Sequence, residues 1–132
     1  MPRYMFDTNM CIYLMQQQPP TVAARFAQCH VGDVVMSSIT FAELEYGLSV
    51  CARPERERQA LDVLAEMIEV LPFDINAARA YGPACRATRN RKTDYLDKLI
   101  AAHCISLGAT LVTNNELDFP GYPGLLIENW LK

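Results

Sequence analysis

The stretch Tyr4-Met5-Phe6-Asp7-Thr8-Asn9 decides the fold. A short apolar run ends in an acid, and two small polar residues follow before a helical pattern begins at Met10. In a parallel α/β sheet, ligand-binding groups lie just beyond the carboxyl ends of the strands. We therefore expect Arg3–Phe6 to form a buried strand and Asp7 to point into a crevice at the end of that strand.

The rest of the chain alternates short apolar runs with longer segments of helical spacing. Further strands are predicted at Val34–Met36, Val70–Phe73, Thr110–Val112 and Leu125–Ile127. Helices are predicted at Thr8–Met15, Thr21–Cys29, Thr40–Val50 and Pro54–Ile68, from Asp74 to Thr88, and from Asp94 to Gly108. Strands separated by helices imply right-handed crossovers and a parallel sheet covered on both faces. We predict one domain, residues 1–132, with a three-layer α/β/α architecture around a mainly parallel sheet of four to five strands.

Composition limits the class of protein. A hydrophobic content of 51% over 132 residues is typical of a globular domain, and no apolar run is long enough to cross a membrane. The five cysteines are odd in number and lack CxxC spacing, which favours free thiols in a reducing compartment, so we expect a cytoplasmic protein. The net charge of −3 is unusual for a nucleic-acid binder, but a bound divalent cation would cancel acids gathered in one site.

Three more acids, Glu43, Asp97 and Asp118, occur where a predicted strand hands over to a helix or loop, as Asp7 does. Such points converge on one edge of a doubly wound sheet. Carboxylates crowded in a low-dielectric crevice repel one another unless they are protonated or paired with cations. Oxygen ligands of this kind suit Mg²⁺ or Mn²⁺, so the four acids predict one metal site.

Each acid also has a simpler interpretation. Asp7 could cap the helix that follows it, since Asp is a favoured N-cap. Glu43 stands three residues after a threonine, which is the spacing of a capping box. Asp97 stands three residues after another aspartate and could be an N3 acid near a positive helix end, while Asp118 could be an ordinary loop acid.

The surroundings of Glu43 favour a ligand over a cap. Ile39, Ala42, Tyr46 and Val50 share its predicted helical face, whereas a capping glutamate is normally more hydrated. A histidine-based mechanism is not favoured, because no Ser or Cys partner for His103 is apparent in the sequence. The six glycines are scattered and form no phosphate-binding loop.

A basic cluster leads into the Asp97 segment. It consists of Arg86, Arg89, Arg91 and Lys92. A solvated helix end would explain it, but next to a metal site it is also a candidate contact surface for a phosphate backbone.

The chain resembles the PIN-domain ribonucleases of the VapC type, which are toxins of bacterial toxin–antitoxin pairs. The resemblance spans essentially the whole length and rests on motifs in the same order and spacing. These motifs are Phe6–Asn9, Ser37–Leu44 with Tyr46-Gly47, Asp97–His103, Val112–Asn115 and Glu128–Trp130.

The resemblance implies which residues form the site. The family's strand-end acid falls on Asp7, and its helix acids fall on Glu43 and Asp97. Its last acidic position falls on Asn115, with Asp118 as the residue that could supply the charge. Thr8, Asn9, Thr113 and Asn115 would support these acids.

The resemblance also implies a function. It implies Mg²⁺- or Mn²⁺-dependent endonucleolytic cleavage of RNA that inhibits translation, with transfer RNA, such as the initiator cut in its anticodon region, as a substrate. It further implies a toxin homodimer and a VapB-like antitoxin whose tail blocks the site. The alternatives are a non-catalytic metal-binding or protein-interaction domain on the same fold, and a DNA-directed nuclease or phosphatase.

Overall fold

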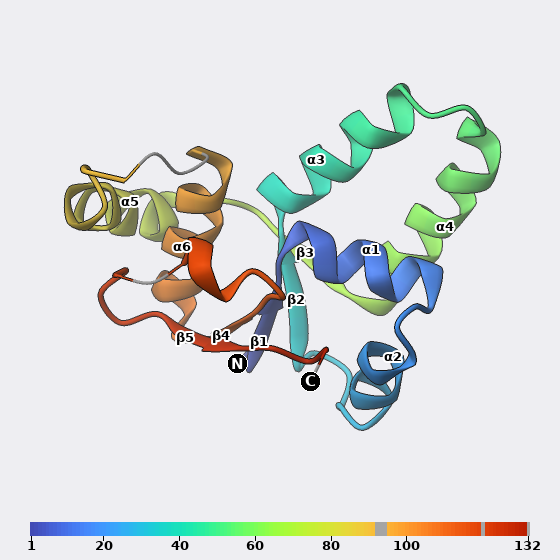
Figure 1. Cartoon of the computed structure of the whole chain (residues 1–132), viewed down its shortest axis with the longest axis horizontal. Coiled ribbons are helices and arrows are strands. Elements are labelled where there is room, and N and C mark those ends of the chain that lie inside the picture. The colour runs from blue at the N-terminus through green and yellow to red at the C-terminus, as the bar shows by residue number, and fades with distance from the viewer. Residues whose placement is uncertain (92–94, 120, 132) are drawn as a thin grey trace.

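The computed structural model describes residues 1–91, 95–119 and 121–131, and in this part of the chain the strands form one parallel sheet (Figure 1). The strands are β1 (Tyr4–Phe6), β2 (Val34–Ser37), β3 (Glu69–Leu71), β4 (Thr110–Val112) and β5 (Leu126–Glu128). They lie in the order β3-β2-β1-β4-β5, and each neighbouring pair is parallel. The predicted parallel sheet is confirmed, at the upper end of the expected strand number.

Helices connect the strands and cover both faces of the sheet (Figure 1). They are α1 (Thr8–Gln16), α2 (Pro20–Ala27), α3 (Ser38–Ser49), α4 (Pro54–Met67), α5 (Ile75–Ala87), α6 (Tyr95–Leu107) and the short 3₁₀ helix η1 (Glu116–Asp118). Most predicted elements agree within two residues. The predicted helix start at Asp94 lies outside the described residues.

Three predicted boundaries differ from the structure by two residues: the end of α2, at Ala27 and not at Cys29, the start of α3 and the end of β3. Helix α3 begins at Ser38 and not at Thr40, because the Ser37 side chain caps it by accepting a hydrogen bond from the Ile39 amide at 3.1 Å. Strand β3 ends before Phe73, whose amide donates to Ser38 Oγ at 3.0 Å instead of to a neighbouring strand. At the last two of these boundaries a side-chain acceptor replaced the partner that the local pattern suggested.

The sheet separates two apolar cores because successive strand residues point to opposite faces. Met5 packs in one core with residues of α5 and α6, whereas Phe6 packs in the other with residues of α1 to α4. Leu111 and Val112 divide between the cores in the same way. This alternation produces the predicted three-layer α/β/α architecture.

The order in which strands are added to the sheet reverses between β1 and β4. From β1 the chain adds β2 and β3 on one side, and β4 and β5 on the other. Ligand crevices of open α/β sheets form at such a switch point, outside the carboxyl ends of the strands. Because Phe6 pairs with Val112, the next residues, Asp7 and Thr113, emerge side by side at this point.

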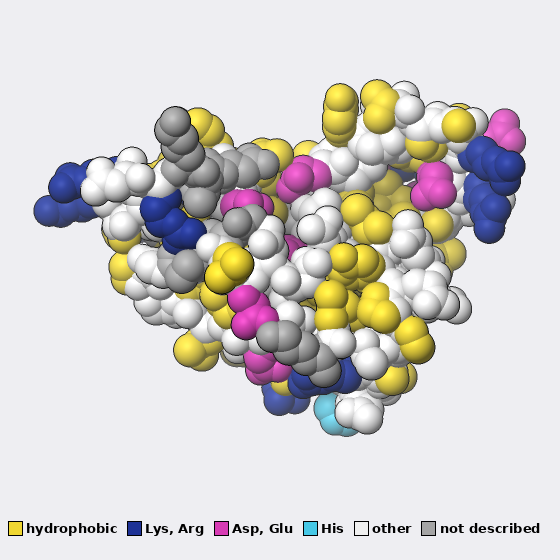
Figure 2. Space-filling model, in the orientation of Figure 1, with side chains coloured by type: hydrophobic (Ala, Val, Ile, Leu, Met, Phe, Trp, Pro, Cys, Tyr) yellow, Lys and Arg dark blue, Asp and Glu magenta, His cyan; other side chains and the backbone are white. Residues whose placement is uncertain are grey.

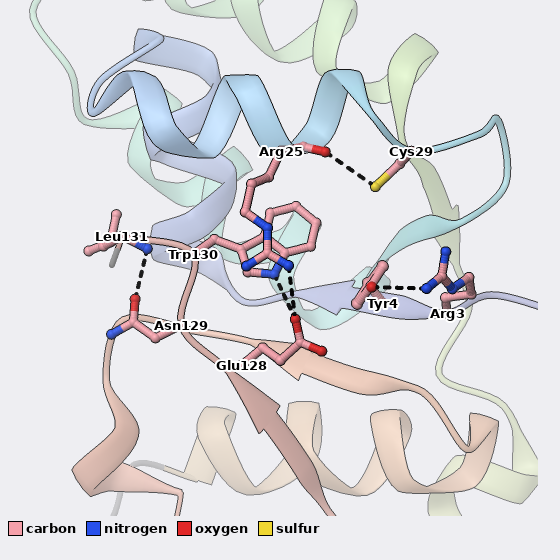
Figure 3. A network of polar contacts seen from close by, with 8 residues as sticks. All are labelled: Arg3, Tyr4, Arg25, Cys29, Glu128, Asn129, Trp130 and Leu131. Carbon is pink, nitrogen blue, oxygen red and sulfur yellow. Dashed lines mark hydrogen bonds and ion pairs between the residues drawn. The ribbon is translucent and has the colours of Figure 1, made fainter.

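The C-terminal segment is fastened to the sheet by Trp130 (Figure 3). Its ring is buried and packs edge-on against Tyr4 and Phe6, with ring centroids 5.1 and 5.2 Å apart. The Arg25 guanidinium lies 4.6 Å from the Trp130 ring centroid, and both side chains donate to Glu128. The exposed ion pair contributes little, so the aromatic packing carries most of the stabilisation.

The cysteines are free thiols, as their odd number predicts. Cys11 and Cys104 are buried, and burial raises the pKa of the Cys104 thiol to about 12, so both act as small apolar residues. Within the described ranges, none of the helices is both long and apolar enough to cross a membrane.

Candidate active site

Asp7 lies at the carboxyl end of β1 and caps α1. Its Oδ1 accepts a hydrogen bond from the Met10 amide at 2.9 Å, so the predicted N-cap exists. The side chain is buried, and a hydrogen bond from the Thr113 side chain also stabilises its charged form. The cap therefore does not exclude a second role, because the same carboxylate also lines a pocket.

Asp7 is unfavourably placed as a free anion. Burial raises the pKa of its carboxyl above the ordinary value of 3.8, and the nearby charge of Glu43 raises it further, although the hydrogen bonds from Thr113 and Met10 oppose the rise. Desolvation and a like charge both favour the protonated form. A bound cation would relieve both effects.

Glu43 reaches the same pocket from α3, and the alternative interpretation, that it is a capping-box residue, was wrong. Because Ser37 is the N-cap of α3, Glu43 stands in the second turn, beyond the position of a capping-box glutamate. Its Oε1 instead accepts a hydrogen bond from Thr8 Oγ1 at 2.7 Å. Thr8, a predicted supporting residue, thus orients the Glu43 carboxylate and directly follows Asp7 in the chain.

The apolar residues around Glu43 do not bury it in the way the sequence suggested. Tyr46 and Val50 are 71% and 66% exposed, and Ala42 is also exposed. They form an exposed apolar stripe on α3 beside a half-buried carboxylate. Glu43 is therefore favoured as a ligand by its place in the pocket and by its bond to Thr8, and not by apolar burial.

Asp97 lies in the first turn of α6, on the other side of the pocket. The following residue, Lys98, is a buried cation that the sequence patterns had not marked. Its Nζ donates to the Thr88 carbonyl at 3.4 Å, which ties α6 to the end of α5. The sequence feature that could have marked Lys98 is a lysine next to an acid in a mostly apolar helix.

Three of the four predicted acids line a single pocket of about 220 Å³. The lining residues come from every region predicted to contribute, and are Asp7, Thr8, Asn9, Glu43, Asp97, Asn115 and Phe119. Figure 2 shows acidic side chains on both sides of the hollow between α6 and α3. Phe119, which is buried, is an addition that no sequence feature had marked.

The fourth position is occupied by Asn115. Asn115 lines the pocket, and its backbone amide donates to Thr113 Oγ1 at 2.9 Å. Asn115 is thereby linked to Thr113, whose side chain also forms a hydrogen bond with Asp7. The backbone of Asp118 ends η1, and its side chain lies outside the described structure. The neighbouring Asn114 donates to the Tyr13 hydroxyl at 3.0 Å and so fixes this loop to α1.

The donor chemistry of the pocket fits a hard divalent cation. Carboxylates of Asp7, Glu43 and Asp97, with the amide oxygen of Asn115, form an all-oxygen set of the kind that Mg²⁺ and Mn²⁺ prefer. Among the described residues, no three His, Cys, Asp or Glu side chains are close enough together to surround one ion. The three carboxylates line one space, in which Thr8 holds Glu43, and Thr113 and the Met10 amide hold Asp7.

The predicted basic cluster divides into residues with different surroundings. Arg86, near the end of α5, and Arg89 are exposed. Arg91 is half-buried, and its Nη2 donates to the Leu117 carbonyl at 2.9 Å, so it also fastens the loop that carries Asn115. Lys92 lies outside the described residues.

Comparison with known proteins gives consistent matches over nearly the whole chain. Residues 4–123 match the PIN domain family. The tRNA(fMet)-specific endonuclease VapC of Shigella flexneri is 36% identical over 132 residues, covering 98% of this chain and 99% of the relative. Ribonuclease VapC2 of Rickettsia felis is 35% identical over 133 residues, covering 98% of both proteins.

Solved structures agree with these matches. The DNA-bound VapBC structure from Salmonella typhimurium contains a chain with a TM-score of 0.91 and 33% identity, covering 98% of this chain and 99% of that one. The Rickettsia felis VapBC2 structure, bound to a promoter DNA fragment, gives a TM-score of 0.87 and 32% identity, covering 96% and 98% of the two chains.

Proposed function

Because this chain belongs to the PIN domain family and, within it, to the VapC ribonucleases, we propose that it is a metal-dependent endoribonuclease and the toxin of a toxin–antitoxin pair. The observation that carries the proposal is that Asp7, Glu43 and Asp97, from three separate elements, line one pocket. The Shigella relative is named for cleavage of tRNA(fMet), so initiator transfer RNA cut in its anticodon region, in the cytoplasm, is the first substrate to test.

Asp7, Glu43 and Asp97 would hold the divalent ion, with Asn115 completing the set. When bound, the ion supplies Lewis-acid stabilisation of the charge that develops on the scissile phosphate. The chain's own contribution is orientation. Thr8 holds Glu43, and Thr113 and the Met10 amide hold Asp7, so these carboxylates are placed before RNA arrives.

A VapB-like antitoxin is the proposed protein partner, because the matched structures are VapBC complexes. An apolar trough of about 230 Å³ between α1, α3 and α4 supports this proposal, because it shares Thr8 and Glu43 with the acidic pocket. Hydrophobic side chains are visible between α1 and the α3–α4 arm in Figure 2. An antitoxin segment seated there would extend into the pocket and exclude RNA.

We also propose that the toxin forms a homodimer. The exposed stripe on α3, with Tyr46 and Val50, is the apolar surface that supports a second copy as its occupant. Sedimentation of the isolated toxin should give a dimer, and replacing Tyr46 with Glu should shift it toward the monomer.

The decisive experiment is cleavage-site mapping on total RNA with the purified protein, with and without Mg²⁺. We expect a few discrete cuts that appear only with the metal and disappear when the antitoxin is added. Cleavage of DNA in preference to RNA would favour the DNA-nuclease alternative. Metal binding with no cleavage of either nucleic acid would favour a non-catalytic domain.

Metal binding should be visible in stability. A ligand that binds only the folded state stabilises it by RT ln(1 + [L]/Kd), which is about 2.7 kcal/mol at a hundredfold excess over Kd. We expect Mg²⁺ or Mn²⁺ to raise the melting temperature of the wild type and to have much less effect on Asp97→Asn. Asp62→Asn is the matched control, because the Asp62 side chain is exposed on α4 and does not line the pocket. Equal shifts in all three proteins would remove Asp97 from the ligand set.

The exposed arginines should contribute to RNA affinity. Each lost contact with a phosphate of single-stranded RNA should reduce the slope of log binding constant against log salt concentration by about 0.7. The double variant Arg86→Glu, Arg89→Glu should therefore reduce this slope by about 1.4. The control is the double reversal of Arg53 and Arg56 at the start of α4, which changes net charge equally. Binding of a labelled transfer RNA across a salt series measures both, and an equal weakening in the two variants would assign the effect to net charge.

A further inference from the structure

A buried hydrogen bond joins the two helices that carry Glu43 and Asp97. Ser37, the N-cap of α3, lies with its Oγ 2.8 Å from Nδ1 of His103 in α6. Ser37 is 0% and His103 1% exposed. This contact spans 66 positions in sequence, and it is the serine partner for His103 that was not apparent from the sequence.

A short Ser–His contact can activate a nucleophile, but burial excludes that role here. A nucleophile must touch substrate, and neither side chain lines the acidic pocket. The pair lies instead where β2 passes into α3 and contacts α6. Its effect on the reaction must therefore pass through the residues it holds.

The Ser37–His103 hydrogen bond needs one donor and one acceptor. Ser37 Oγ accepts a hydrogen bond from the Ile39 amide at 3.1 Å, and we assign its hydroxyl proton to the contact with His103 Nδ1. Nδ1 is then an acceptor and the ring proton resides on Nε2. Burial lowers the pKa of His103, against the opposing effect of the Asp74 charge, which agrees with a neutral ring.

The same junction is held from a third side. The His103 ring packs edge-on against Phe73, with centroids 5.5 Å apart, and the Phe73 amide donates to Ser38 Oγ at 3.0 Å. The start of α3, the segment after β3, and the middle of α6 are thus connected by consecutive contacts. Such a connection resists relative movement of α3 and α6.

We propose that the Ser37–His103 hydrogen bond is a positioning device that keeps the Glu43 helix and the Asp97 helix at a fixed separation across the pocket. The need for it is electrostatic, because two carboxylates facing one pocket repel and tend to separate the helices that carry them. The inference rests on the proposed function for its catalytic consequence. Hydrogen-bond partners behind metal ligands typically matter by about 10- to 100-fold in metal affinity or activity.

The test compares two substitutions that differ in one acceptor. In His103→Asn, the amide oxygen can occupy the place of Nδ1 and accept from Ser37. In His103→Leu, the volume is kept but no acceptor remains, and both variants lack the ring that packs on Phe73. We expect His103→Leu to lower kcat by about 10- to 100-fold with KM for RNA unchanged, and to weaken Mn²⁺ binding in calorimetry by a similar factor. His103→Asn should stay close to the wild type in both measurements.

The outcomes separate the two proposals. Equal kcat and equal Mn²⁺ affinity in the Asn and Leu variants would overturn the positioning role. If the wild type cleaves no RNA, the proposed function fails, while the calorimetric comparison still decides on the Ser37–His103 hydrogen bond. If His103→Leu does not fold, His103→Gln replaces it, because its amide reaches the place of Nε2 and leaves Ser37 without an acceptor at Nδ1.

Discussion

Replacing Asp7 with Asn is expected to abolish RNA cleavage while the protein remains folded. Asn keeps the size of the side chain and can accept the Met10 amide hydrogen bond, and Asn and Asp are equivalent as N-caps. It removes the negative charge that would hold the ion. Because Lewis-acid stabilisation is worth several kcal/mol, we expect the initial cleavage rate at saturating Mg²⁺ to fall by at least about 100-fold.

Asp74 provides a matched control for this substitution. It caps α5 through a hydrogen bond from the Ala77 amide at 3.0 Å, in the same way as Asp7 caps α1, but it does not line the pocket. Asp74→Asn should therefore leave the cleavage rate unchanged. Full activity of Asp7→Asn would reduce Asp7 to a cap and remove the central ligand from the proposed site.

The same substitution should stabilise the metal-free protein at neutral pH. The pKa of Asp7 is raised in the folded state, so the folded protein holds this proton more tightly than the unfolded chain does. By linkage, the stability of the wild type falls as the pH rises from the ordinary value of 3.8 through the raised folded pKa. Melting curves in EDTA across this range should show a smaller fall for Asp7→Asn, and identical curves would contradict the burial of an ionised Asp7.

Replacing Glu43 with Gln should have an effect of comparable size. Gln retains an oxygen that can accept the Thr8 hydrogen bond, so α3 and its contact with α1 should persist. What disappears is a negative charge in the pocket. Since Glu43 is not at a capping-box position, no local helical role is removed, and we expect a loss of at least about 100-fold in cleavage rate with little change in melting temperature.

Glu45 is the control on the same helix. It is paired with Arg58 at 2.7 Å on the surface and does not line the acidic pocket. Glu45→Gln removes the same charge from α3 and should leave cleavage intact. If Glu43→Gln and Glu45→Gln cleave RNA equally well, Glu43 does not take part in the reaction.

The local sequence predicted most of the fold because its signals are short-range. Apolar runs of three or four residues marked β1, β2, β4 and β5, and helical spacing marked the helices between them. The parallel order then followed from the connections, and the strand-end position of Asp7 followed from the order. The boundary of α3 was misplaced because two candidate caps, Ser37 and Thr40, lie three residues apart, and only hydrogen bonding chooses between them.

The sequence alone predicted that Asp7, Glu43 and Asp97 would share a site, since each stands where a strand hands over to a helix or follows soon after, and all three line one pocket. Only the tertiary structure decided how they are held. The bonds from Thr8 to Glu43, from Arg91 to Leu117 and between Ser37 and His103 join residues 26 to 66 positions apart. No local pattern encodes such pairs, because each requires two elements to be packed before donor and acceptor meet. Placing Asn115 in the pocket likewise depended on the loop that Thr113 and Arg91 fasten after the sheet has formed.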